Sequence, residues 1–112
     1  MTTPILTLGE LAESQASKYI TINTALRKIE AVTIRVLSQA NSGPPGAPAD
    51  GDAYIVDVQS GAWSAFAIDS IAYYSNTSWY EMVPKSGFRT WIVDEAALYV
   101  YSSAGWQSLV AL

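Results

Sequence analysis

Three of the four tryptophans in this 112-residue chain close short segments of one design, which limits what the second half can fold into. Each segment is a tyrosine-containing, strand-like run, then small polar residues, then a tryptophan: AYIVDVQSGAW at 53–63, AYYSNTSW at 72–79 and YVYSSAGW at 99–106. Strand-like runs joined by turn residues are typical of β-hairpins. The pattern predicts a compact β module from residue 53 onward. It leaves open whether the aromatic rings fill a core or face a partner.

The spacing of turn residues divides this module, residues 53–112, into seven short strands. We expect strands at 54–58, 62–67, 71–75, 79–83, 90–93, 97–101 and 106–112, with glycine, proline, asparagine and serine between them. Short strands with regular turn signals favour a small antiparallel sandwich, an open barrel or a meander. Residues 43–52, GPPGAPADGD, interrupt both helix and sheet and are expected to be a linker.

The first part of the chain, residues 1–42, has a different pattern. Residues 1–9 resemble an extended apolar arm, residues 10–18 a short helix, and residues 24–37 a second helix. One apolar stripe with helical spacing runs along that second helix: Ile22, Leu26, Ile29, Thr33 and Val36. The stripe can pack on the β module or on copies of itself around a symmetry axis. The fold class expected is therefore α+β, with an N-terminal arm and helical assembly region before the β module.

Composition favours assembly over an isolated monomer. Half of the residues are apolar and only 14% are charged, well below the roughly 25% of ordinary soluble domains. A small molecule with so little charge is expected to bury apolar surface against other chains. The net charge of −4 argues against nucleic acid as a partner.

The sequence predicts neither export nor membrane insertion. Its first residues, MTTPILTLGELAES, have neither the basic start nor the long apolar run of a signal peptide. No stretch of the sequence has the length and apolar character of a membrane span. We expect synthesis in the cytoplasm of a host, with release only inside a larger particle.

Catalytic, cofactor and metal sites are not expected. The chain lacks cysteine and histidine, which leaves no thiolate ligand and no ordinary nucleophile–base pair. Paired carboxylates for glycoside hydrolysis could only come from acids in predicted turns, namely Asp57, Asp69, Asp94 and Glu95. Asp50–Gly51–Asp52 could suggest calcium, but too few further oxygen ligands follow, and a tight turn into a strand is the favoured interpretation.

The aromatic residues supply the other candidate surface. Most tryptophans in so small a β domain are needed for buried area, so core or subunit interface is favoured. Tyr73–Tyr74 and Trp79–Tyr80 are neighbours along strands, and one residue of each pair must face outward. The possible aromatic contact surface consists of Tyr74, Trp79 and Tyr80.

The order of motifs resembles a small domain of unassigned chemistry found in tail-fibre and other virion proteins of bacteriophages and gene transfer agents. The resemblance covers most of the chain, and the order and spacing of the motifs are more specific than any one of them. The matching stretches include QASKYITINTALRKIEA at 15–31, PGAPADGDAYIV at 45–56, IAYYSNTSW at 71–79 and GFRTWIVDEAALYVYSSAGW at 87–106. One departure is Tyr19, where the family often has histidine.

The resemblance implies a structural virion component at the tail baseplate or fibre root, a homotrimer, with no catalytic residues. It implies other virion proteins as partners. Three other roles stay open: a capsid decoration protein, a carbohydrate-binding module that recognises host surface glycan, and a glycan hydrolase.

Overall fold

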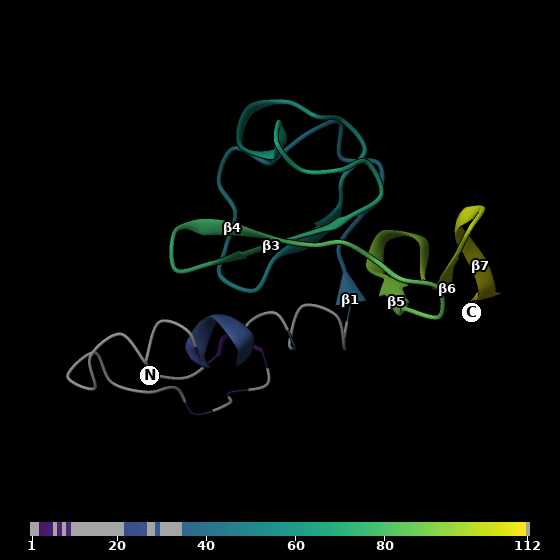
Figure 1. The fold of residues 1–112 in the computed structure, drawn as a ribbon, viewed down its shortest axis with the longest axis horizontal. Helices are drawn as coiled ribbons and strands as arrows, with labels where there is room; N and C mark the ends of the chain where they lie inside the picture. Colours follow the sequence, from purple (N-terminus) through teal and green to yellow (C-terminus); the bar gives the residue numbers. More distant parts are fainter. Residues whose placement is uncertain are drawn as a thin grey trace.

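The described part of the chain is mostly β-structure in two sheets (Figure 1). The computed structural model describes residues 3–5, 7, 9, 22–26, 29 and 35–111, without the side chains of residues 110 and 111. The larger sheet has the order β1-β5-β6-β7, formed by Arg35–Val36, Arg89–Ile92, Ala97–Ser102 and Gly105–Ala111. The smaller sheet has the order β2-β3-β4, formed by Ala53–Ile55, Ile71–Ser75 and Ser78–Met82. The described residues also form the 3-10 turns η2 at Gly61–Trp63 and η3 at Val93–Glu95.

Two of the three expected tryptophan-closed hairpins are confirmed. In the first, β3 and β4 place Tyr74 opposite Trp79 and Ser75 opposite Ser78. The two turn residues, Asn76 and Thr77, both have positive φ, 51° and 64°, as a type I′ turn requires. The second hairpin joins β6 to β7 and uses Gly105, with φ of 95°, at the residue after its turn.

Thr77 provides a test of this turn. A β-branched residue at positive φ is strained, and glycine adopts the same backbone without that cost. We expect Thr77→Gly to raise the free energy of unfolding by about 0.5–1 kcal/mol, since relief of strain exceeds the added entropy of the unfolded chain. Urea unfolding measures the change. A glycine variant less stable than the parent would contradict the turn assignment.

The hairpin expected at 53–63 is wrong, as is the strand expected at 62–67. β2 pairs instead with β3, in the register Ala53 with Tyr73 and Ile55 with Ile71. The chain between them forms a long loop with backbone hydrogen bonds of its own. The amide of Trp63 donates to the carbonyl of Ser60 at 2.9 Å, and the amide of Phe66 donates to the carbonyl of Trp63 at 3.0 Å. In each bond the amide donates to the carbonyl three residues earlier, which is the pattern of a 3-10 turn. Trp63 therefore enters the core from a 3-10 turn and not from a strand.

The α+β class with an N-terminal helical region is also wrong. Among the described residues before β1, only 22–26 and 29 are helical, and Arg35–Val36 form a strand where the second helix was expected. β1 runs parallel to β5, with Val36 opposite Ile92. The sequence around it, VTIRV at 32–36, is rich in β-branched residues, which favour strands. The apolar residues of the stripe have helical spacing, and this spacing led to the prediction of a helix at the same residues.

The segment after β1 connects the two sheets. The amide of Leu37 donates to the carbonyl of Ala53 at 2.7 Å, and the amide of Ile55 donates to the carbonyl of Ser38 at 3.0 Å. On its other side, the carbonyl of Leu37 accepts from the amide of Asp94 at 3.2 Å. One short segment therefore lies between β2 and the end of β5.

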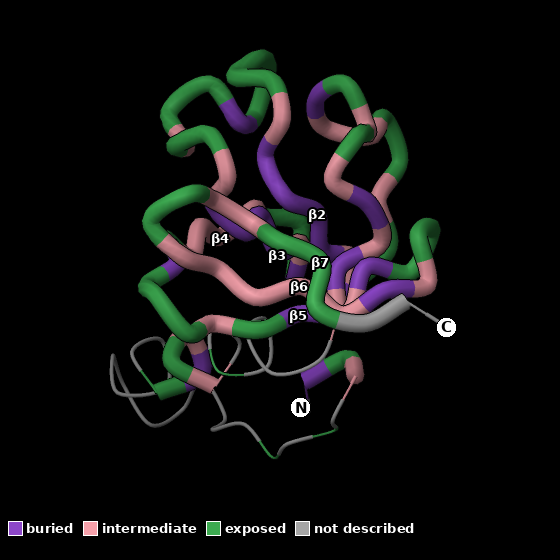
Figure 2. The backbone as a smooth tube through the Cα atoms, turned by 90° about the vertical axis from the view of Figure 1, so that its right-hand side faces the viewer, coloured by how far each residue is buried: buried purple, intermediate pink, exposed green. Residues whose placement is uncertain are grey.

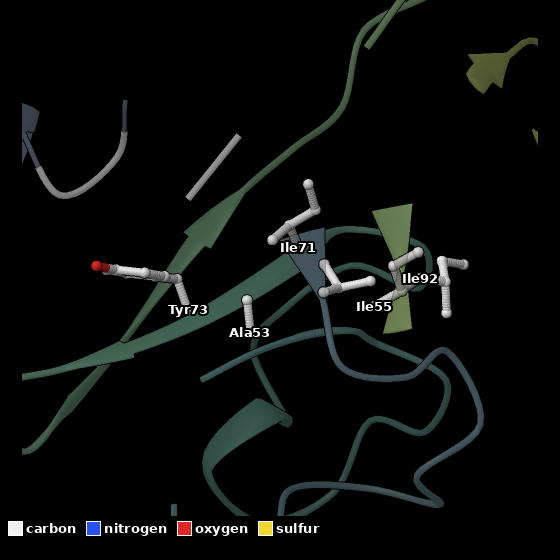
Figure 3. Packing of buried hydrophobic residues seen from close by; sticks show 6 residues of the cluster. Ala53, Ile55, Ile71, Tyr73 and Ile92 are labelled. Carbon is white, nitrogen blue, oxygen red and sulfur yellow. The ribbon is translucent and has the colours of Figure 1, made fainter. Parts of the chain in front are cut away.

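The smaller sheet buries both of its faces because alternate residues point to opposite sides. One face packs against the larger sheet, and the core there consists of Val36, Ala53, Ile55, Ile71, Tyr73 and Ile92 (Figure 3). The other face packs against the loop between β2 and β3 through Tyr54, Val56, Trp63 and Ala72. Figure 2 shows the buried strands at the centre and exposed loops around them.

Candidate interaction surface

The three residues of the predicted aromatic contact surface do not form one surface. Tyr74 and Trp79 lie opposite each other on β3 and β4, with ring centroids 5.0 Å apart. Tyr80 is opposite Tyr73 and points to the other face, where it packs against the core between the sheets. All three side chains are half-buried. The structure therefore brings Tyr74 and Trp79 together and separates Tyr80 from them.

The Tyr74–Trp79 pair is the outer rim of a packed aromatic cluster. Trp79 contacts the ring of Trp63 edge-on, with centroids 5.4 Å apart, and Tyr54 lies 5.9 Å from Trp63. Trp63 is 0% exposed and its indole Nε1 has no hydrogen-bond partner. Burial raises the pKa of the Tyr54 phenol, and the carboxylate of Asp52 raises it further. The interior of the cluster is core, and only the rim is accessible.

A second aromatic pair fastens the last hairpin to the smaller sheet. Tyr101 and Trp106 face each other across β6 and β7 with centroids 5.1 Å apart. The Trp106 Nε1 donates to the backbone carbonyl of Asp69 at 2.8 Å. Asp69 comes just before β3, so this bond ties the start of β7 to the other sheet. The repeated tryptophan-after-turn pattern indicated the hairpin but not this long-range bond.

Most carboxylates of the acidic half hold loops by accepting hydrogen bonds from backbone amides. The Asp50 Oδ1 accepts from the amide of Asn76 at 3.0 Å, and the Asp52 Oδ2 accepts from that of Ala49 at 2.9 Å. The expected turn at Asp50–Gly51–Asp52 is confirmed, with Gly51 at φ of 91°. Glu81 of β4 likewise accepts from the amide of Ala67, at 2.7 Å.

Two of the acids considered for glycoside chemistry also accept hydrogen bonds within the chain, Asp57 from backbone amides and Glu95 from side chains. The Asp57 carboxylate accepts from the amides of Ser42 and Gly43, at 2.6 Å and 3.1 Å. Glu95 accepts from the Gln39 Nε2 at 2.7 Å and from the Tyr99 hydroxyl. That hydrogen bond to Glu95 is the main cause that raises the pKa of Tyr99. Among the described residues, no group of three acidic side chains could hold a metal ion.

Asp57 gives a prediction that tests this structural role. Ser42 and Gly43 have φ of 62° and 103°, and their consecutive amides both donate to the Asp57 carboxylate. We expect Asp57→Ala to lower the free energy of unfolding by about 2 kcal/mol, because two charge-assisted hydrogen bonds are lost. Asp57→Asn keeps one acceptor and should cost about half as much. Chemical unfolding measures both.

The control for Asp57 is Asp94→Ala. Asp94 is acidic, exposed and in a short turn, so its removal should change stability by less than about 0.5 kcal/mol. Equal losses at the two positions would show that Asp57 acts only through its charge.

The predicted assembly stripe is not one continuous face. Ile22 and Ile29 are 45% and 52% exposed, and Leu26 is half-buried. Val36 is 0% exposed inside the core between the sheets, so it is not accessible to a partner. Thr33 lies outside the described residues. The stripe as an assembly surface stays a prediction for Ile22, Leu26, Ile29 and Thr33.

Large apolar side chains are exposed at several other places in the described chain. They include Val58 and Ile68 in the loop between β2 and β3, Val83 and Val93 after strands β4 and β5, and Leu109 on β7. Among the described residues, no helix has the length and apolar character that a membrane crossing requires.

Comparison with known proteins identifies the family. The model of a family described as a protein of unknown function (DUF2793) matches residues 22–107, most of the chain, so the chain belongs to that family. The expectation of a small domain of unassigned chemistry is thereby confirmed. No curated protein matches the chain.

Proposed function

We propose that this protein is a structural component of a bacteriophage particle, at the tail fibre or baseplate, that acts through lasting contacts with copies of itself and with other virion proteins. The chain would be made in the host cytoplasm and reside in the virion. The motif order resembles virion proteins of phages and gene transfer agents, and this resemblance supplies the biological setting. The proposal does not depend on the number of copies.

The observation that carries the proposal is the exposed apolar surface of a chain with few charges. Seven large apolar side chains are exposed in the described residues, among them Ile22, Ile29 and Leu109, while only 14% of the chain is charged. Contacts with other chains would remove such side chains from water, at roughly 25 cal/mol per Å² of apolar area. Permanent assemblies are more apolar than transient ones.

The use of the carboxylates supports the same role. Asp50, Asp52, Asp57, Glu81 and Glu95 each bind groups of their own chain. A carboxylate that orders a loop in this way contributes to a rigid scaffold. Rigid loops reduce the entropy that is lost when a surface docks on a partner.

Localisation on particles tests the proposal. A short epitope tag is added to the chain in the strain that encodes it, and particles are purified and labelled with a gold-conjugated antibody. Label on tails is the expected result. Label on heads would favour the capsid decoration protein, and particles that contain none of the chain would contradict both roles.

One observation favours the second candidate, a carbohydrate-binding module. The Tyr74 and Trp79 rings meet at 5.0 Å and are half-exposed, and such aromatic rims bind sugars. Binding to host lipopolysaccharide that is lost in Tyr74→Ala, with folding unchanged, would support this role. Tyr80→Ala is the matched control because its ring faces the core between the sheets.

A further inference from the structure

Each sheet has two end strands. β1 and β2 lie at the ends that the segment after β1 joins, through the bridge between Ser38 and Tyr54, and β4 and β7 lie at the opposite ends. An edge strand presents unpaired N–H and C=O groups on its outer side, and natural proteins protect such edges with charges, prolines or short strands. β4 is protected in this way. It carries Glu81 within its five residues, and Pro84 follows two residues after its end.

β7 has neither charge nor proline and is not short. It is the longest strand of the described chain, seven residues from Gly105 to Ala111, with the sequence GWQSLVA. Its register with β6 shifts once, by a β-bulge at Leu109 between the pairs Leu98–Val110 and Tyr99–Ser108, and its pairing with β6 is regular from Gly105 to Ser108. Gln107, Ser108 and Leu109 are exposed, Leu109 to 53%. Within the described residues, β7 pairs only with β6. Figure 1 shows it at the right-hand end of the molecule, beyond β6.

We propose that β7 pairs antiparallel with β7 of a second copy of this chain, about a two-fold axis. The two larger sheets then form one continuous sheet, in which β7 of each copy has β6 on one side and β7 of the partner on the other. The proposal rests on the edge itself and is independent of the phage setting proposed above.

The charge of the chain favours a second copy as the partner that pairs with the β7 edge. Each copy has a net charge of −4, so most ways of joining two copies bring acids together. A two-fold axis at β7 places an uncharged strand against an uncharged strand, and the backbone hydrogen bonds of an antiparallel ladder supply the attraction. Side chains such as Leu109 are partly covered by their neighbours across the new pair.

The closed symmetry explains why β7 pairs with itself and not with β4. Pairing of β7 with β4 of another copy leaves a free edge at each end and invites further addition, or needs a ring to close. Pairing of β7 with β7 uses both uncharged edges in one contact and leaves, at the outer ends of the described sheets, the β4 edges that carry Glu81. A soluble assembly of defined size follows.

The first test is the mass of the full chain in solution. Light scattering over a range of protein concentrations should show a dimer of the 12.1 kDa chain that dissociates on dilution. Ser108→Lys places like charges on both strands of the pair and should raise the dissociation constant about tenfold or more. Ser103→Lys is the matched control, because Ser103 is exposed in the turn between β6 and β7, outside the strand.

The outcomes are decisive in both directions. A dimer that Ser108→Lys weakens and Ser103→Lys leaves intact supports the pairing. A monomer at all concentrations, a trimer, or a dimer that is indifferent to Ser108→Lys overturns it. Circular dichroism of each variant shows that the fold is kept.

Cross-linking gives a second, independent test because the chain contains no cysteine. Gln107, Ser108 and Leu109 are each replaced by cysteine in separate variants, and mild oxidation is followed in time. Facing residues of an antiparallel pair lie about 4.5–5.5 Å apart at Cα, within disulfide reach. At least one variant should cross-link faster than Ser64→Cys, whose site is exposed in the loop between β2 and β3. If none does, β7 does not face its own copy.

Discussion

Replacing Trp63 with alanine is expected to lower the free energy of unfolding by about 3–5 kcal/mol, the usual cost of removing a buried aromatic ring. Trp63 is 0% exposed and holds the centre of the cluster formed with Tyr54 and Trp79. Small domains have a total stability of about 5–15 kcal/mol, so this loss is a large part of the whole. Urea unfolding followed by circular dichroism measures it without relying on tryptophan fluorescence.

Trp63→Phe is the control that separates packing from the indole nitrogen. The Trp63 Nε1 is buried without a hydrogen-bond partner, which costs about 1–3 kcal/mol. Phenylalanine keeps much of the ring and removes that unpaired donor, so it should cost at least about 2 kcal/mol less than alanine. An alanine variant within about 1 kcal/mol of the parent would show that the η2 turn does not bury this ring.

Local signals in the sequence predicted the hairpins whose strands are close neighbours along the chain. Asn76 and Gly105 mark the two turns, and the residues opposite each other, Tyr74 with Trp79 and Tyr101 with Trp106, follow from those turns. A turn of two residues fixes the register of its strands, so no information from elsewhere in the chain is needed.

Pairings between distant segments were not predictable in the same way. β1 pairs with β5 across more than fifty residues, and β2 pairs with β3 across the whole loop that carries η2. Neither contact has a turn beside it to fix the register. Two signals conflict at Arg35–Val36: the spacing of apolar residues predicts a helix, and the β-branched residues favour a strand. Pairing with β5 stabilises the strand.

At the candidate surfaces, too, local features were predictable and long-range contacts were not. Strand alternation indicated that one ring of each neighbouring pair faces outward, but it did not choose Trp79 over Tyr80. The burial of Trp63 beneath the Tyr74–Trp79 rim depends on a loop whose path the sequence does not indicate. The acids were correctly expected near turns, whereas the backbone amides that Asp57 and Asp50 bind lie in other segments of the chain. Local chemistry was therefore easier to predict than the contacts it makes.

Val36 and Ile22 belonged to one predicted assembly stripe, and aspartate substitutions should now separate them. Val36 is 0% exposed between the two sheets, opposite Ile92 on β5. An aspartate there is either charged without a partner or forced to protonate, and both cost several kcal/mol. We expect Val36→Asp to lower the free energy of unfolding by more than about 4 kcal/mol. Loss of the cooperative urea transition and of the native circular dichroism spectrum would report it.

Ile22→Asp makes the same chemical change at a site that is 45% exposed. Its carboxylate stays in water, so stability should change by less than about 1 kcal/mol. If Ile22 contacts another subunit, this variant should alter the assembled mass while each copy remains folded. Equal unfolding by both substitutions would mean that residue 22 is also core. A folded Val36→Asp protein would mean that β1 is not held between β5 and β2, and the way in which the two sheets are joined would be wrong.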